Sequence, residues 1–519
     1  QAGKKVLTFG CQMYTDGIVN TVTDENGGWN AMRYGITEGL FKFNDSMEVE
    51  PWLADSYTVN DEHTEWVITL KDGIKFSDGC DLTPTKVKEC FEYLKEMGPS
   101  GSAKPQKYLE FEATITADDA ANTLTIQTTQ PYANLPGQLA HPTMAIVDVA
   151  DTENFDNGTI GTGPYMIENF NGVGVGYDLA ANPNYREEVP YDEVKLMYMG
   201  DASAKTMALQ SGQVDLVENI TNVSDIQDFK DNPDFTVDIA SGVRCGFSWM
   251  NFDGVLGNKT LRQAILMGID YDTICHSKTI GDLYTPGFSV LPSTLSYGYE
   301  NLNNPYTYDP EGAKKLLDDA GIVDTDGDGI REYNGKNLSY KAECPTGWSD
   351  WNATLEIVAA AGKNIGINIE TYFPEAANFS TDYSTGNFEI TMQSGPGTSV
   401  ANPYMRCRFF MSSDYNDLEV NFSGNFGHYQ NDRVDEILAA IPHETDDAKL
   451  KDYYTELSKI MLEDCPCVPL MYRPQVFHEV NESVWTNYPQ KDDGTNVPPM
   501  DCTDGYGVAA LYNLELIDG

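Results

Sequence analysis

The sequence has few basic residues for its length and no long apolar run. Its 519 residues include 33 lysines and arginines against 80 aspartates and glutamates, so the formal net charge is −47 at pH 7. This balance argues against a nucleic acid as partner, because a polyanion would be repelled. A bilayer-spanning helix needs about 18 or more consecutive apolar residues, and no such run occurs. The sequence therefore predicts a globular protein large enough to form more than one lobe.

Local motifs of catalytic and metal centres are also missing. The six histidines are never three or four residues apart, and neither HExxH nor G-x-S-x-G occurs. The ten cysteines include no C-x-x-C pair, which disfavours a zinc ribbon or a thioredoxin-like site, and we expect mostly reduced, buried thiols. We predict no catalytic residue. A glycoside-processing enzyme stays an alternative, because the paired carboxylates of glycosidases need no local motif.

The segment that is most informative is 71–87, KDGIKFSDGCDLTPTKV. It predicts two glycine turns and a helix start, with Thr83 as N-cap and Pro84 in the first turn. Other short phrases follow along the chain in a fixed order. They are GITEGL at 35–40, PWLADSY at 51–57, GTGPY at 161–165, NPNY at 182–185, SGQVDL at 211–216, LRQAI at 261–265, EDCP at 463–466 and VPL at 468–470.

Together these phrases resemble the peptide/nickel family of extracellular solute-binding proteins, the receptors that feed ABC importers. The resemblance covers nearly the whole chain. It implies an α/β fold of two lobes, like the periplasmic binding proteins, with hinge strands and an extra β-rich subdomain in the first lobe. We place lobe I at 1–245 and 480–519 with the insert at about 45–160, lobe II at 250–475, and the hinge strands near 244–251 and 471–480.

Hydrophobic periodicity supplies the helices. It predicts a helix from about Trp29 to Leu40, and others at 258–275, 309–320, 350–365, 430–441 and 447–463. The helix near 309 is the best delimited. Asp309 is a good N-cap, Pro310 falls in the first turn, and Gly321 stands where a C-terminal glycine belongs.

The resemblance also implies where the protein works and with what. We expect an extracellular location, either as a cell-surface lipoprotein or in the periplasm, with a signal segment and, for a lipoprotein, a lipid-bearing cysteine lying upstream of this chain. The expected partners are the permease subunits of an ABC importer and a small-molecule ligand, and we expect a monomer. No cofactor is predicted apart from a structural Ca²⁺.

The calcium prediction rests on 324–332, DTDGDGIRE, which matches the opening of a calcium loop. Position 12 is Gly335, where an EF-hand has its bidentate glutamate, so the alternative is an acidic turn without metal. The candidate ligands are the carboxylates of Asp324, Asp326, Asp328 and Glu332 and the carbonyl of Ile330.

Two loops that follow strands, 345–352 and 393–404, are the candidates for the ligand site. In dipeptide-binding relatives, comparable loops carry an arginine for the ligand carboxylate and an aspartate for its amine. Here the first loop has tryptophans and no arginine, and the second has no acidic residue. A buried ligand charge without a counter-charge costs several kcal/mol. We therefore predict a neutral oligosaccharide, and PTGWSDW at 345–351 resembles the oligosaccharide-binding branch. An oligopeptide is the alternative.

The candidate ligand-binding residues are aromatic rings that can stack on sugars and amides or hydroxyls that can bond them. Trp348 and Trp351, three apart at a helix start, could instead pack together on one face. The other tryptophans carry the same packing alternative. The full set is Trp29, Asn30, Trp249, Asn251, Trp348, Trp351, Ser394, Asn402 and Tyr404.

Overall fold

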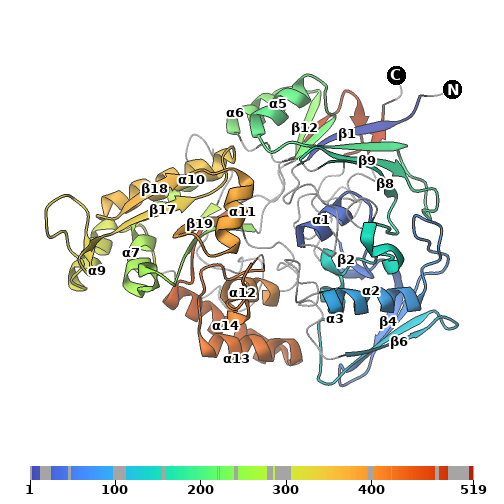
Figure 1. The fold of residues 1–519 in the computed structure, drawn as a ribbon, viewed down its shortest axis with the longest axis horizontal. Coiled ribbons are helices and arrows are strands. Elements are labelled where there is room, and N and C mark those ends of the chain that lie inside the picture. The colour runs from blue at the N-terminus through green and yellow to red at the C-terminus, as the bar shows by residue number, and fades with distance from the viewer. Residues whose placement is uncertain are drawn as a thin grey trace.

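The computed structural model describes residues 3–11, 25–44, 48–97, 113–154, 159–172, 174–218, 220, 222–238, 244–276, 285–286, 305–394, 403–421, 423–473, 478–488 and 514–517. Within these residues the fold is α/β, built on three larger sheets that are visible in Figure 1. Asn402 lies outside the described residues.

The first large sheet has the strand order β12-β21-β11-β1-β10-β9-β8 among the described residues. Its strand β1 pairs in parallel with β10 on one side and β11 on the other. The helices α5 and α6 accompany this sheet at the top of Figure 1. The bounds are β1 Val6–Cys11, β8 Tyr165–Gly172, β9 Gly176–Ala181, β10 Glu193–Tyr198, β11 Leu216–Glu218, β12 Phe235–Asp238, β21 His478–Asn481, α5 Ala202–Gln210 and α6 Val223–Lys230.

The second sheet is antiparallel, with the order β4-β5-β7-β6. Its strand β5 alternates, so that Trp66, Ile68 and Leu70 are buried beneath α2 while the residues between them are more exposed. Gly73 and Gly79 have φ of +73° and +92°, which confirms the two predicted turns. The bounds are β4 Ala54–Val59, β5 Glu65–Leu70, β6 Ala113–Asp118, β7 Thr123–Thr128, α2 Pro84–Met97 and α3 Leu135–Leu139.

The third sheet, with the order β14-β20-β13-β19-β17-β18, carries helices on both faces. Its strands β17, β18 and β19 are parallel to one another. The bounds are β13 Arg244–Met250, β14 Thr285–Pro286, β17 Ser339–Glu343, β18 Asn368–Tyr372, β19 Ile390–Ser394, β20 Cys467–Arg473, α7 Lys259–Gly268, α8 Tyr271–His276, α9 Pro310–Asp319, α10 Ser349–Asn364, α11 Ala376–Ser384, α12 Pro403–Met411, α13 Asp432–Ala440 and α14 Asp447–Asp464.

Short elements complete the described fold. They are α1 Glu25–Arg33, β2 Phe41–Phe43, β3 Val49–Pro51, β15 Glu332–Tyr333, β16 Lys336–Asn337, β22 Trp485–Thr486 and β23 Glu515–Leu516. The helix predicted from Trp29 to Leu40 is wrong beyond Arg33. Gly35 has φ of +77°, a conformation that ends a helix, and Glu38 beyond it forms an isolated antiparallel bridge with Ile146.

The helix α9 confirms its sequence signals. The Asp309 carboxylate accepts a hydrogen bond from the Gly312 N–H, Pro310 begins the helix, and Gly321 follows it with φ of +73°. These signals act within one turn of the chain, so no distant contact can override them.

Two large hydrophobic clusters join parts of the chain that are far apart in sequence. One contains side chains of the antiparallel sheet and of α12, α13 and α14. The other contains side chains of the third sheet together with Leu209 of α5 and Ile226 of α6. The first sheet draws its strands from 6–238 and 478–481, and the third from 244–473. The predicted lobe boundaries and hinge motion stay predictions.

Candidate functional site

Both candidate loops leave the same edge of the third sheet. Strands β17 and β19 are parallel neighbours, with Glu343 opposite Thr391 in register. The chain leaves β17 after Glu343 and β19 after Ser394. Since the carboxyl ends of parallel strands lie at one edge, the two loops start side by side. We call this the carboxyl edge.

The loop after β17 reaches toward the helix α5 of the first sheet. Gly347 has φ of +79°, and a Cβ placed on it would lie 3.3 Å from the Asp201 carboxylate. Asp201 is the N-cap of α5 and accepts a hydrogen bond from the Ala204 N–H. The carboxyl edge therefore faces the first sheet, which is where a site between two lobes would lie.

Trp348 and Trp351 meet edge to face at the start of α10. Their ring centroids are 5.0 Å apart at 75°, and Trp348 also lies 6.3 Å from the ring of Phe379 in α11. Trp351 is 5% exposed and belongs to the core cluster of the third sheet, whereas Trp348 is only half-buried. Trp351 thus anchors the pair, and Trp348 keeps the surface on which a ligand ring could stack.

Trp249 and Asn251 are engaged by the protein itself. Trp249 is fully buried, with the rings of Phe409, Phe410 and Phe426 at 5.1–6.0 Å. The Asn251 amide donates to two backbone carbonyls in 386–388, and its oxygen accepts from the Asp253 N–H. The amide of Asn251 has no donor left for a ligand, because it fastens the chain around it.

Asn30 lies on α1 and differs from Asn251, because its side-chain amide makes no hydrogen bond within the described part of the protein. It is 1% exposed, yet neither its amide nitrogen nor its oxygen has a hydrogen-bond partner. Buried amides in native proteins are nearly always bonded, so Asn30 is a candidate to bond either a ligand or a buried water. The side chains of Trp29 and Ser394 lie outside the described residues, although the backbone of each is placed in α1 and β19.

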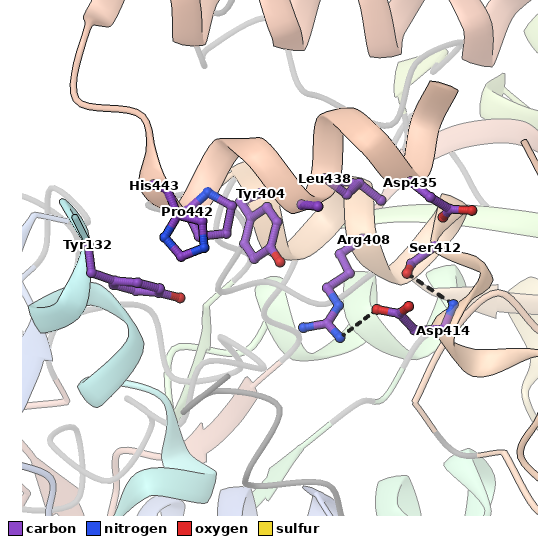
Figure 2. A pocket seen from close by; sticks show the side chains of 10 residues that line it. Tyr132, Tyr404, Arg408, Ser412, Asp414, Asp435, Leu438, Pro442 and His443 are labelled. Carbon is purple, nitrogen blue, oxygen red and sulfur yellow. Dashed lines mark hydrogen bonds and ion pairs between the residues drawn. The ribbon is translucent and has the colours of Figure 1, made fainter. Parts of the chain in front are cut away.

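Tyr404, in the first turn of α12, lines a pocket of about 230 Å³. The pocket lies where the chain after the antiparallel sheet meets α12 and α13, and Figure 2 shows Tyr132 across from Tyr404 and Arg408. The lining residues are Tyr132, Tyr404, Arg408, Ser412, Asp414, Asp435, Leu438, Ala439, Pro442 and His443.

The charged side chains inside this pocket are held by ion-pair or hydrogen-bond partners within the protein. The Arg408 side chain is 3% exposed and lies 3.2 Å from the Asp414 carboxylate. The Asp435 carboxylate accepts hydrogen bonds from the backbone and hydroxyl of Ser413. A pocket of tyrosines and paired charges suits a polar, uncharged ligand.

Sequence reasoning missed Arg406 and Arg408. Both lie on α12 and are buried. The loops themselves lack a ligand-pairing charge, but these two arginines follow directly after the second loop. Two arginines spaced two residues apart, directly beside a candidate binding loop, are a sequence signal for a charged group near the site.

Sequence reasoning also missed three polar side chains at the carboxyl edge. Glu343 is 3% exposed and Thr391 fully buried, and the Glu343 Oε1 and Thr391 Oγ1 atoms have no hydrogen-bond partner. The Gln393 Nε2 atom is likewise buried and unpartnered. Burial, assisted by the negative charge of Asp382, raises the pKa of Glu343 to about 8. No local pattern marks a lone glutamate at the end of a strand as special.

The acidic loop at 324–332 is folded by its own hydrogen bonds. Carboxylate oxygens of Asp324, Asp326 and Glu332 lie within 4.8 Å of one another. The Asp324 carboxylate accepts from the N–H groups of Gly327 and Gly329, and these bonds lower the pKa of Asp324. Oxygen donors at this spacing fit the chemistry of Ca²⁺.

One other predicted ligand of that loop, Asp328, is less favourably placed. The Asp328 carboxylate accepts hydrogen bonds from the Ile330 N–H and the Asn337 amide. It is not part of the close group formed by the other three carboxylates. A cation there would have to take Asp328 from its present partners.

The remaining predictions concern thiols and membranes. Seven of the described cysteines are buried free thiols and Cys80 is an exposed one, as expected for a large chain that does not depend on disulfides. Among the helices in the described parts of the chain, none combines the length and the apolar character that crossing a membrane requires.

The fold and the carboxyl edge define the class of two-lobed α/β binding proteins, and comparison with known proteins agrees. Residues 48–417 match the model of the bacterial extracellular solute-binding proteins, family 5. The nickel-binding protein NikA of Staphylococcus aureus is 26% identical over 86% of this chain and 84% of its own length. The probable D,D-dipeptide-binding periplasmic protein DdpA of Escherichia coli is 24% identical over 91% and 89%.

Solved structures show the same fold. The mannohexaose-bound periplasmic oligopeptide-binding protein from Thermotoga maritima superposes with a TM-score of 0.87 at 24% identity, with both chains fully covered. The chain belongs to the family 5 bacterial extracellular solute-binding proteins. It is a substrate-binding protein of the peptide/nickel class, the class that serves ABC importers.

Proposed function

We propose that this protein captures a neutral oligosaccharide between its two lobes and delivers it to the permease subunits of an ABC importer. The observation that carries the proposal is the character of the carboxyl edge and of α1. Trp348 offers a partly open ring, while Asn30, Thr391 and Gln393 offer uncharged polar atoms that lack partners. A hydroxyl-rich ligand supplies the missing partners without burying a charge.

Charge pairing in the pocket of Tyr404 supports the same ligand. Arg408 is already neutralised by Asp414, so an incoming carboxylate would have to displace that partner. The mannohexaose bound to the Thermotoga maritima protein of the same fold is consistent with a sugar ligand. Under this proposal the site binds and releases its ligand unchanged, and no residue acts as a catalyst.

An oligopeptide is the second candidate, and one observation favours it. Arg406 and Arg408 lie directly after the second loop, where a peptide carboxylate could be received. The relatives of this chain include the oligopeptide-binding protein AppA of Bacillus subtilis, which is 24% identical over 83% of this chain. A peptide would need one of the two arginines to exchange its present partners.

We further propose that the protein works outside the cytoplasm as a monomer, either as a cell-surface lipoprotein or in the periplasm. The acidic loop of Asp324, Asp326 and Glu332 would hold a structural Ca²⁺, with Asp328 and the Ile330 carbonyl completing the site. That ion would steady the connection between α9 and β15 and would take no part in solute binding.

The proposal is tested by isothermal calorimetry with three probes: mannohexaose, the peptide Ser-Thr-Ser-Ala and the nickel–histidine complex. We expect mannohexaose to bind with little dependence on salt, because a neutral ligand gains nothing from screened charges. Binding of the peptide alone, with no response to the sugar, would assign the protein to the peptide branch. Steady hydrolysis of mannohexaose would instead support a glycoside-processing enzyme.

A further inference from the structure

Three polar side chains occupy neighbouring positions on one face of the third sheet. Thr391 of β19 lies between Glu343 of β17 and Trp249 of β13, each directly opposite it in register. Residues opposite one another on adjacent strands project to the same face. Gln393 lies two residues further along β19, opposite Phe247, and so it projects to that face too.

Each of these three side chains, and Trp249 beside them, carries a polar atom that is buried and unpartnered. The atoms are Glu343 Oε1, Thr391 Oγ1, Gln393 Nε2 and the indole Nε1 of Trp249. A buried polar group without a hydrogen bond costs about 1–3 kcal/mol. Four such groups on adjacent strands would together destabilise the fold, unless a bound molecule supplies their hydrogen-bond partners.

The position of these groups at the sheet edge indicates which kind of bound molecule would supply these partners. Glu343 and Gln393 stand at or next to the last residues of β17 and β19, at the carboxyl edge from which both candidate loops depart. Trp348 lies five residues after Glu343, at the start of α10. Ligands of open α/β sheets bind outside the carboxyl ends of the strands.

We propose that Glu343, Thr391 and Gln393 form a hydrogen-bonding floor at the carboxyl edge that contacts the hydroxyl groups of the bound solute. The inference rests on the proposed function for the identity of the solute. Trp249 lies behind this floor, where its fully buried ring packs against its aromatic neighbours and does not contact the solute.

Glu343 is the residue that gives the floor its selectivity. Burial and the carboxylate of Asp382 on α11 raise the pKa of Glu343 to about 8, while the Lys341 ammonium on its own strand acts in the opposite direction. The Lys341 ammonium lies over the Tyr372 ring of β18 at 4.6 Å. The α10 residue Asp350 adds a further negative charge near the adjacent Cys344. A neutral carboxyl group both donates and accepts, which matches a sugar hydroxyl.

A neutral and a cationic solute would act on this carboxyl group in opposite directions. A neutral solute excludes water and penalises the ionised form, so its affinity should fall as the pH rises past 8. An ammonium group favours the ionised form, so its binding at pH 7 should release a proton. Calorimetry in two buffers of different ionisation enthalpy measures that release directly.

The test uses the intact protein, mannohexaose and four variants. Thr391→Val and Glu343→Leu each remove hydrogen-bonding atoms and should weaken binding by about tenfold, the factor that corresponds to 1.4 kcal/mol. Glu343→Gln keeps a donor and an acceptor, so it should bind nearly as well as wild type and lose the pH dependence. Glu370→Gln, an exposed carboxylate on the next strand, is the matched control for charge and should change nothing.

The outcomes separate this inference from the proposed function. If mannohexaose binds wild type and the Thr391 and Glu343 variants alike, with only their thermal stability altered, buried water satisfies these groups and the floor is overturned. If mannohexaose fails and Ser-Thr-Ser-Ala binds, the sugar proposal fails. The floor then stands if Glu343→Gln abolishes proton release on peptide binding, and falls if that release persists.

Discussion

The Nδ1–H of His443 is hydrogen bonded to the carbonyl oxygen of Pro131 at 2.9 Å. The next residue, Tyr132, places its ring edge-on to the same imidazole at 5.9 Å. Pro131 follows the antiparallel sheet, whereas His443 follows α13, so two residues more than 300 positions apart join these parts of the fold. The pocket of Tyr404 lies beside this contact.

Because the two contacts share one imidazole, they should be coupled. His443→Ala is expected to lower the free energy of unfolding by about 1 kcal/mol, the worth of a typical hydrogen bond. Tyr132→Leu should lower it by more than this, since an aromatic pair contributes about 0.5–1.5 kcal/mol and the Tyr132 hydroxyl also accepts a buried hydrogen bond from the Gln138 amide. A double-mutant cycle from urea denaturation should show that the two losses are less than additive. Strict additivity would mean that the two side chains act independently.

The two tryptophans of α10 should respond differently to truncation. Trp348→Ala is expected to weaken ligand binding by about 1–3 kcal/mol, a range taken from base stacking on aromatic rings, with a small change in stability. Trp351→Ala should destabilise the fold by about 3–5 kcal/mol, because it empties a core position. Calorimetry and thermal melting of both variants distinguish these results. Unchanged affinity in Trp348→Ala would remove that ring from the site.

The stability of the protein should depend on pH through Glu343. Its pKa is raised to about 8 in the folded protein, whereas an unfolded glutamate titrates near 4.3. Between these values the folded state holds the extra proton, so stability falls as the pH rises. From pH 5 to pH 7 we expect a loss of about 2 kcal/mol from this group.

The variant Glu343→Gln should be free of that loss, so its stability advantage over wild type should grow from pH 5 to pH 7. Urea denaturation at both pH values measures the difference. Glu370→Gln again serves as the control for removing one carboxylate. An advantage that stays constant with pH would show that Glu343 is ionised in the folded state.

The acidic loop gives a prediction about metal removal. If Asp324, Asp326 and Glu332 hold Ca²⁺, a chelator should lower the melting temperature and added Ca²⁺ should restore it. Asp326→Asn should remove this response, while Asp319→Asn, an exposed carboxylate near the end of α9, should retain it. Metal analysis after dialysis in trace Ca²⁺ provides an independent check. A melting curve that ignores both chelator and Ca²⁺ would identify the loop as an acidic turn held by its own hydrogen bonds.

How much the sequence could predict depends on the range of the interactions involved. The helix α9 follows from Asp309, Pro310 and Gly321, since capping acts over one turn. The family phrases, each short, together predicted the fold that the comparisons confirm. The helix predicted at 29–40 is wrong beyond Arg33, because the positive φ of Gly35 ends the helix there.

The site was harder to predict because burial is a property of the assembled sheet. Trp249 lies on β13, a strand with neighbours on both sides, and packing on its face decides that the ring is enclosed. Glu343 and Thr391 become neighbours only when β17 and β19 pair, although they are 48 positions apart in the sequence. Neither relationship produces a periodic pattern in the sequence from which it could be predicted.

The hydrophobic cluster that unites the antiparallel sheet with α12, α13 and α14 has a thermal consequence. Any separation of the antiparallel sheet from these helices brings apolar side chains of the cluster into water and raises the heat capacity. The hydrophobic contact within this cluster weakens on cooling, because hydrophobic association is largely entropic near room temperature. The contact between the antiparallel sheet and these three helices should therefore be less stable in a cold environment than at room temperature.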